Sequence, residues 1–243
     1  MNRYATKLAK KILPTKLFLL LKQVHKTCLR FIHMNNLNNL ALVHGTDKWG
    51  HHSYTQHYST YFSKFRNERL SILEIGIGGY DNQANGGHSL RMWKDYFPNS
   101  VIYGLDIINK SLLTEKRIRI LQGDQTDTVF LKEIIEKNGR MDIIIDDGSH
   151  NPFHQIITFK TLFPQLNPGG FYAVEDTVTT YFKSWGGSEN INNPDTFLGF
   201  AKRLTDCVNS NGISEKLGDL TPYSDIEFVH FFKNLVVIKK AQK

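Results

Sequence analysis

The feature that most constrains this chain is the alternation, from residue 70 onward, of short β-rich runs with stretches of helical periodicity. Strands that alternate with helices predict a mostly parallel sheet covered by helices on both faces. The last two strand-like runs are joined by Lys233-Asn234 and predict a hairpin, which adds an antiparallel strand at the sheet edge. The expected strands are 70–75, 101–105, 118–122, 141–145, 171–174, 226–232 and 235–239, and the expected helices are 89–96, 128–137 and 152–166.

Charge divides the chain at about residue 40. Residues 1–40 contain eight of the 30 Lys and Arg and none of the 23 Asp and Glu, so residues 41–243 carry 22 basic against 23 acidic side chains. We therefore expect a basic N-terminal arm over 1–40 and one globular domain over 41–243. A neutral body argues against a nucleic-acid-binding domain, which spreads Lys and Arg over its docking face. Two cysteines without metal-ligand spacing, Cys28 and Cys207, favour a reducing, cytoplasmic location.

The N-terminal arm has the pattern of an amphipathic helix that opens near Pro14. Its longest apolar run, 17–21, is too short for a transmembrane span or a secretory signal. We expect residues 1–33 to cover the core or a sister subunit of a homo-oligomer. Docking on an anionic membrane surface, peripheral to the cytoplasmic face, is the alternative. The apolar stripe is Leu17, Leu20, Leu21, Val24, Cys28 and Phe31, and the basic one is Lys22, Lys26 and Arg30. The segment 34–39 that follows reads as a turn-rich junction.

Polar and glycine residues follow each of the first five expected strands. The carboxyl ends of parallel strands meet at one edge of the sheet, which is where open α/β sheets bind their ligands. We therefore expect one site, built from 74–80, Asp106, 123–125, 146–150 and 175–176.

The glycines after the first strand indicate a cofactor that approaches the backbone closely. Gly76 and Gly78, with an acidic residue at the second strand end, suit either a dinucleotide or S-adenosylmethionine. The dinucleotide fingerprint requires a third glycine at position 81, but this chain has Asp81 there, and the next helix begins only near Ser89. Both departures argue against a dinucleotide.

The Glu-x-Gly-x-Gly pattern at 74–78, with Asp106, resembles the class I S-adenosylmethionine-dependent methyltransferases. The resemblance implies their Rossmann-like fold, with a seven-stranded sheet. It also implies that Glu74 and the backbone of Gly76 and Gly78 line the methionine part, and that Asp106 binds the ribose. On the same resemblance Asp124 and Gln125 lie near the adenine, and the remaining cofactor-binding residues are Tyr80, Ser89 and Asp147.

Three carboxylates are expected to converge at the neighbouring strand ends. Asp147, Glu175 and Asp176 would repel one another unless a hard divalent cation such as Mg²⁺ binds them through oxygen. A hydroxyl bound to such a cation loses its proton more easily. His150 is placed to accept that proton as a general base, and Asp146 to brace the loop.

These residues narrow the resemblance. The run 146–150 followed by Glu175-Asp176, with 44–48 and 89–93 upstream, resembles the metal-dependent sugar O-methyltransferases of macrolide and anthracycline-type antibiotic biosynthesis. It covers roughly residues 41–243 and implies methyl transfer to a sugar hydroxyl, with Mg²⁺ on Asp147, Glu175 and Asp176 and with His150 as the base. The sugar's neighbouring hydroxyls would complete the ligand set. We expect the chain to lack the N-terminal auxiliary domain of the macrolide enzymes.

Two further segments bear on the site. The run 51–58 reads as a polar loop that covers the cofactor, with Tyr54 and Tyr58 in contact with it, rather than as a metal cluster of its histidines. The aromatic segment 179–187, with Tyr181, Phe182 and Trp185, either stacks on a substrate or packs its own loop.

Two other functions remain open from the sequence. One is an O-methyltransferase that acts on a catechol-like molecule or on a cell-surface glycan. The other is a non-catalytic scaffold with the same fold at a membrane.

Overall fold

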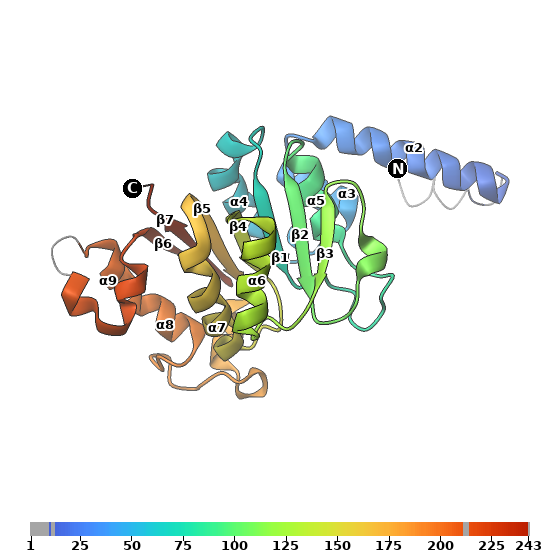
Figure 1. Ribbon diagram of the computed structural model, residues 1–243. Coiled ribbons are helices and arrows are strands. Elements are labelled where there is room, and N and C mark those ends of the chain that lie inside the picture. The colour runs from blue at the N-terminus through green and yellow to red at the C-terminus, as the bar shows by residue number, and fades with distance from the viewer. Residues whose placement is uncertain (1–9, 11–12, 211–213, 243) are drawn as a thin grey trace. The chain divides into compact units, whose positions relative to one another are not determined.

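The computed structural model describes residues 10, 13–210 and 214–242 (Figure 1). The chain forms two compact units, Met1–Arg66 and Asn67–Lys243. The sequence-based boundary at residue 40 stays a prediction. Among the described residues, no helix combines the length and apolar character needed to cross a membrane.

The N-terminal unit is helical. Helix α2 (Thr15–His33) begins directly after Pro14, as expected. The next helix, α3 (Leu37–His44), is capped by Asn36, whose side chain accepts a hydrogen bond from the Asn39 amide, so the expectation of a turn-rich junction over 34–39 is wrong from residue 37 onward. The unit continues with α4 (Tyr54–Phe62) and the short 3₁₀ helix η1 (Ser63–Phe65).

The C-terminal unit contains a seven-stranded sheet in the order β3-β2-β1-β4-β5-β7-β6. The first five strands pair in parallel, and β7 pairs antiparallel with both β5 and β6, which confirms the predicted fold and hairpin. The strands are β1 (Ser71–Ile75), β2 (Val101–Asp106), β3 (Ile118–Gln122), β4 (Met141–Asp146), β5 (Leu166–Glu175), β6 (Ile226–Phe232) and β7 (Leu235–Lys240).

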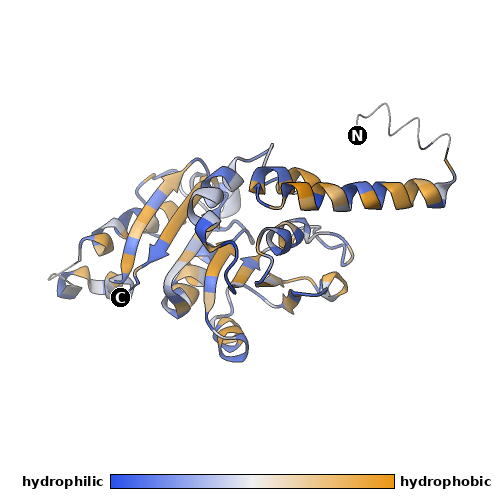
Figure 2. Cartoon of the chain, turned by 90° about the horizontal axis from the view of Figure 1, so that it is seen from above, coloured by the Kyte–Doolittle hydropathy of each residue, from blue (hydrophilic) through white to orange (hydrophobic). Residues whose placement is uncertain are grey.

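Helices cover both faces of this sheet, as the alternation predicted. Strand residues that point to one side, such as Leu73 and Ile75, share a core with α6 (Thr128–Asn138), α7 (Pro152–Leu162) and α8 (Phe197–Arg203). On the other face lies α5 (His88–Tyr96), whose Trp93 indole donates to Glu74 of β1. Figure 2 shows the apolar residues of the sheet strands in orange.

Two parts of the unit differ from the prediction. The helix expected over 152–166 ends at Leu162 and passes into η3 (Phe163–Gln165), because Pro164 cannot continue the α-helical hydrogen bonding, and β5 then starts at Leu166. The segment between β5 and β6 contains elements that sequence periodicity did not reveal. They are η4 (Thr177–Tyr181), η5 (Lys183–Trp185), α8, α9 (Thr205–Val208) and η6 (Ser214–Tyr223), and a further short helix, η2 (Ser111–Leu113), follows β2.

Both cysteines carry free thiols. Cys28 is exposed on α2, and Cys207 is buried in α9. Burial raises the pKa of the Cys207 thiol to about 11, so this group stays protonated and packs as a small apolar side chain.

Candidate active site

The loops that follow β1, β4 and β5 lie side by side because these strands are neighbours in the sheet. Ile75 of β1 pairs with Asp146 of β4, which in turn pairs with Val174 of β5. The amide of Asp147 donates to the Ile75 carbonyl at 2.9 Å, so the loop after β4 starts directly against the end of β1. The predicted convergence of these strand ends is present.

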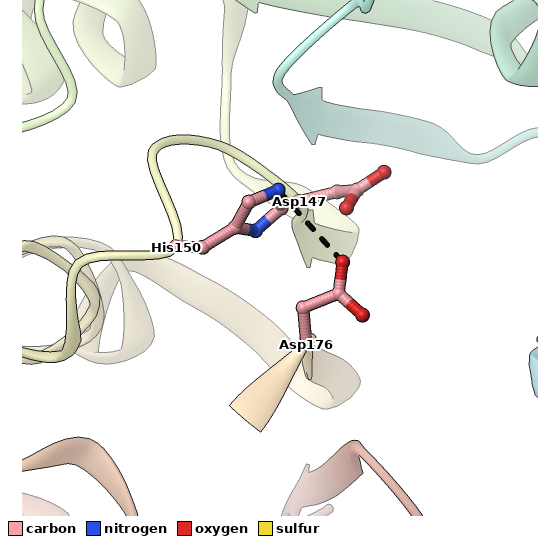
Figure 3. Close-up of side chains that lie close together, drawn as sticks. All are labelled: Asp147, His150 and Asp176. Atoms are coloured by element: carbon pink, nitrogen blue, oxygen red, sulfur yellow. Dashed lines mark ion pairs between the residues drawn. The ribbon is translucent and has the colours of Figure 1, made fainter. Parts of the chain in front are cut away.

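Three polar side chains gather at this edge of the sheet. Asp147, His150 and Asp176 each offer one ligand atom, and these atoms all lie within 4.8 Å of one another. The His150 Nε2 atom lies 3.8 Å from Asp176 Oδ2 (Figure 3). Opposite ligands of an octahedral Mg²⁺ are about 4.2 Å apart, so the separations of these three atoms are close to those that such an ion requires. Two carboxylates with an adjacent imidazole therefore fit a divalent cation.

Glu175, the third predicted ligand, lies outside this group. It is the last residue of β5, pairs with Leu235 of β7, and is almost completely buried, at 1% exposure. The structure thus brings His150 rather than Glu175 next to the two aspartates. Because Mg²⁺ prefers oxygen ligands to imidazole nitrogen, the proximity of His150 is compatible with a base beside the ion. The assignment of Glu175 as a ligand stays a prediction.

The site contains unusual backbone conformations. His150 and Asp176 have φ angles of 55° and 52°, and Tyr80 has a φ angle of 46°. A residue with a side chain in this region costs on the order of 1 kcal/mol or more, so the surrounding structure must hold it there. These are three of the five non-glycine residues that have a positive φ angle in the described part of the chain. Such strain typically accompanies functional sites.

A pocket of about 550 Å³ opens between these loops. Its wall includes Trp185, whose ring lies 5.9 Å from the His150 ring in an edge arrangement. Trp185 and Phe182 are about half exposed and Tyr80 is 92% exposed, so part of the aromatic segment 179–187 faces solvent at the pocket. The lining residues are Tyr80, Gly148, Ser149, His150, Asp176, Val178, Thr179, Phe182 and Trp185.

The glycine-rich turn after β1 packs tightly against the loop after β4. A Cβ atom on Gly76, whose φ is +86°, would overlap the Asp147 carbonyl group, so only glycine fits there. Asp106, at the end of β2, accepts hydrogen bonds from the amides of Ile77 and Ile108 at 3.0 and 2.9 Å. Asp106 thus lies against the turn, where the resemblance places the ribose.

Two other predicted cofactor residues are buried. Glu74 is fully buried in β1 and accepts a 2.9 Å hydrogen bond from the Trp93 indole. Ser89, in the first turn of α5, is 8% exposed. Their contacts with a cofactor stay predictions.

The two residues assigned to the adenine point in different directions. Asp124 is exposed and accepts hydrogen bonds from the amide and hydroxyl of Thr126, which hold the pKa of its carboxyl below the usual value. Gln125 is 7% exposed, and both of its carboxamide donors are used inside the protein, by Asp146 at 3.3 Å and Thr158 at 3.1 Å. The adenine contact of Gln125 stays a prediction, while its internal bonds are a role that sequence reasoning missed.

Asp146 lies beneath the loop. It is fully buried, and its Oδ1 atom accepts hydrogen bonds from the Gly148 amide at 3.4 Å and from Gln125. Burial raises the pKa of Asp146 to about 7 even though these hydrogen bonds act to lower it. This position matches the expectation that Asp146 braces the loop.

Sequence reasoning also missed Lys110. It is fully buried after β2, and its ammonium group donates to the backbone carbonyls of Tyr80, Asn82 and Asn85 in the glycine-rich loop. No motif surrounds Lys110, so no signal in the sequence distinguishes it from a surface lysine.

The histidine-rich segment 51–58 belongs to the N-terminal unit and is not the polar loop that we expected. It enters α4 at Tyr54, and both Tyr54 and Tyr58 are buried. The His52 ring stacks on Tyr54 at 4.7 Å and meets the edge of His51 at 4.6 Å. The described part of the chain shows no metal-type cluster among these histidines. The contact of Tyr54 and Tyr58 with a cofactor stays a prediction.

The chain is similar to several O-methyltransferases. It is 43% identical over 206 residues to the 8-demethyl-8-alpha-L-rhamnosyl tetracenomycin-C 2'-O-methyltransferase of Streptomyces olivaceus. The matched region covers 84% of this chain and 54% of that protein. It is also 43% identical over 210 residues to the demethylmacrocin O-methyltransferase of Streptomyces fradiae. That match covers 85% of this chain and 53% of the relative. No protein-family model matches the sequence.

Among solved structures, the chain is similar to the MycE methyltransferase from the mycinamycin biosynthetic pathway in complex with Mg, SAH and mycinamycin VI. The TM-score is 0.78 at 40% identity, over 85% of this chain and 54% of that chain. The chain thus spans about half the length of the curated relatives that it matches. Over this matched part, the chain resembles the sugar O-methyltransferases of macrolide and tetracenomycin pathways in both sequence and fold.

Proposed function

We propose that this protein transfers the methyl group of S-adenosylmethionine to a sugar hydroxyl of a glycosylated natural product or glycan, in a reaction that requires Mg²⁺. The observation that carries the proposal is the gathering of Asp147, His150 and Asp176 beside the glycine-rich turn. MycE, at 40% identity, is described in complex with Mg and SAH, the demethylated form of the cofactor, which supports both cofactors.

Asp147, Asp176 and Glu175 are proposed to hold the Mg²⁺ ion. When bound, the ion supplies Lewis-acid chemistry, because it lowers the pKa of a hydroxyl that it coordinates. His150 is proposed to take the proton of the acceptor hydroxyl at Nε2, the ring nitrogen that faces Asp176 Oδ2. Asp176 would then stabilise the imidazolium that forms.

The cofactor is proposed to lie along the glycine-rich turn with its ribose at Asp106. Each oxygen of the Asp106 carboxylate already accepts one backbone amide, and each retains capacity to accept a ribose hydroxyl. The turn at Gly76 and Gly78 has positive φ angles of 86° and 72° and presents backbone rather than side chains. The proposed cofactor set is Glu74, Gly76, Gly78, Tyr80, Ser89, Asp106, Asp124, Gln125 and Asp147.

The acceptor is proposed to bind in the aromatic pocket. Trp185, Phe182 and Tyr80 are exposed and line the same pocket as His150. Sugar rings and flat aglycones both pack well on aromatic faces, so this lining suits a glycoside. A catechol-like acceptor or a cell-surface glycan would present the same pair of neighbouring hydroxyls to the ion.

The first experiment combines binding and turnover. Calorimetry with S-adenosylhomocysteine should show saturable binding, and mass spectrometry should show a gain of one methyl group on glycosides that carry neighbouring hydroxyls. EDTA should abolish turnover and added Mg²⁺ should restore it. The absence of cofactor binding would favour the non-catalytic scaffold. Turnover of catechols alone would identify a catechol-like acceptor in place of a sugar. Turnover that EDTA does not affect would exclude the proposed Mg²⁺ requirement.

Helix α2 suggests a partner. Only Phe18 of its apolar side chains is buried, so a stripe of large apolar residues is exposed, and helical spacing places Lys22 and Lys26 on the opposite face. We propose that this stripe packs on a second copy of the chain in a homo-oligomer. The exposed residues on it are Leu17, Leu20, Leu21, Val24, Phe31 and Ile32.

Light scattering tests this assembly on the full chain. Wild-type protein should be oligomeric, and Leu21→Gln combined with Val24→Gln should dissociate it, while Gln23→Ala on the polar face should not. A monomeric wild-type protein that sediments with phosphatidylglycerol vesicles would replace the proposal with peripheral membrane binding.

A further inference from the structure

The backbone of the loop after β4 is held by three successive amide hydrogen bonds. The Asp147 amide donates to the Ile75 carbonyl, and the Gly148 amide donates to Asp146 Oδ1. The Ser149 amide then donates to the side-chain oxygen of Gln125 at 2.7 Å, which is the shortest of the three. His150, with its positive φ, is the next residue along the chain.

Gln125 is built into this arrangement by contacts on every side. Its Nε2 group donates to Asp146 and to the hydroxyl of Thr158, a fully buried residue of α7. The Thr158 hydroxyl in turn lies 3.1 Å from the Gln125 carbonyl oxygen. A Cβ atom on Gly148 would overlap the Gln125 carboxamide, so the loop backbone lies directly against it.

We propose that Gln125 is a positioning residue, whose carboxamide fixes the loop so that Asp147 and His150 face Asp176. The inference rests on the proposed function for the roles of these three side chains. Gln125 does not reach the pocket lining itself, so it acts through the loop that it binds. An error of about 1 Å in the position of a reacting group can lower turnover by about 10²-fold, which makes such a brace consequential.

The bonding pattern distinguishes this role from simple packing. Gln125 spans three elements, since it follows β3 and binds both the loop after β4 and helix α7. A side chain of similar size and shape without hydrogen-bonding groups fills the same space but releases the Ser149 amide. The packing and the hydrogen bonds can therefore be separated by substitution.

The test compares Gln125→Met with Gln122→Met, the same change at an exposed glutamine at the end of β3. Hydrogen exchange of the peptide that contains residues 147–150 should be faster in Gln125→Met only. Binding of Mn²⁺ alone, measured by calorimetry, should weaken about tenfold or more, as for other residues that orient metal ligands. At saturating cofactor, kcat per cofactor-binding site should fall about 10²-fold.

The proposal is overturned if loop exchange and Mn²⁺ affinity in Gln125→Met equal those of the Gln122→Met control. Because neither readout needs methyl transfer, they decide on Gln125 even if no glycoside is methylated. Should Gln125→Met fail to fold, Thr158→Val removes the hydroxyl that bonds both the carboxamide and the backbone carbonyl of Gln125, and leaves the bond from the Ser149 amide in place. A smaller increase in loop exchange in that variant supports the proposal, and wild-type exchange contradicts it.

Discussion

Replacing Lys110 with methionine tests how the cofactor loop is held. The Lys110 ammonium is the donor to three backbone carbonyls of the glycine-rich loop, with distances of 2.5, 2.8 and 3.3 Å to the oxygens of Tyr80, Asn82 and Asn85. Methionine has a similar length and keeps the buried stem packed, but it donates nothing. The substitution therefore removes the hydrogen bonds and leaves the packing.

The size of the effect follows from these three bonds. A hydrogen bond to a charged group contributes about 1.5–3 kcal/mol, and the simple sum overstates the loss because the released carbonyls are on an exposed loop and can bind water. We take about 2–3 kcal/mol as the net stabilisation of the closed loop. If the cofactor must restore that loop on binding, its dissociation constant should rise about 30- to 150-fold.

Calorimetry with S-adenosylhomocysteine measures this change directly. Lys116→Met is the matched control, because Lys116 is exposed in the loop before β3. The free energy of unfolding of Lys110→Met should fall by the same amount of about 2–3 kcal/mol, whereas that of the exposed control should change little. A cofactor affinity in Lys110→Met equal to that of the control would refute the reasoning.

Three further predictions address the site and its support. His150→Ala should lower kcat about 10²-fold or more while cofactor binding stays intact, and full turnover would remove it as the base. Gly76→Ala should destabilise the protein by about 2 kcal/mol or more in thermal unfolding. The control Gly139→Ala should cost clearly less, because Gly139 has a similar φ of +85° but no neighbour within 4 Å of the added carbon. Burial acts to raise the pKa of Glu115, but the hydrogen bonds and charges of Lys94 and Arg91 outweigh it and lower the pKa. Glu115→Gln should therefore reduce the free energy of unfolding at pH 7 by about 1 kcal/mol, and the difference should vanish as the pH falls below the ordinary carboxyl value of 4.5; a constant difference would contradict this.

The position of the site could be predicted because it depends on topology more than on individual contacts. Alternating strands and helices imply parallel strands, and parallel strands deliver Asp106, Asp147 and Asp176 to one edge of the sheet. The hairpin of β6 and β7 was equally visible, because Lys233-Asn234 separates two apolar runs. The strand–helix alternation and the hairpin both follow from side-chain patterns that run along whole elements of the sequence.

Other features had no such pattern. The segment 177–223 lacks a clear period, so its short helices were missed. Segment 51–58 looked like a polar loop, yet Tyr54 and Tyr58 are buried in α4. Polar composition alone does not separate a loop from a helix that buries its aromatic residues.

The sequence by itself determined the fold class, the strand ends that form the site and the kinds of residue placed there. Only the tertiary structure decided that His150 lies beside Asp147 and Asp176, that Gln125 turns inward to the loop, and that Lys110 donates to three backbone carbonyls. The physical reason is that secondary structure follows periodic side-chain patterns along the chain, which a sequence displays directly. Side-chain direction at a strand end depends instead on a few loop dihedrals, such as the positive φ of His150 and Asp176, which packing between distant segments imposes.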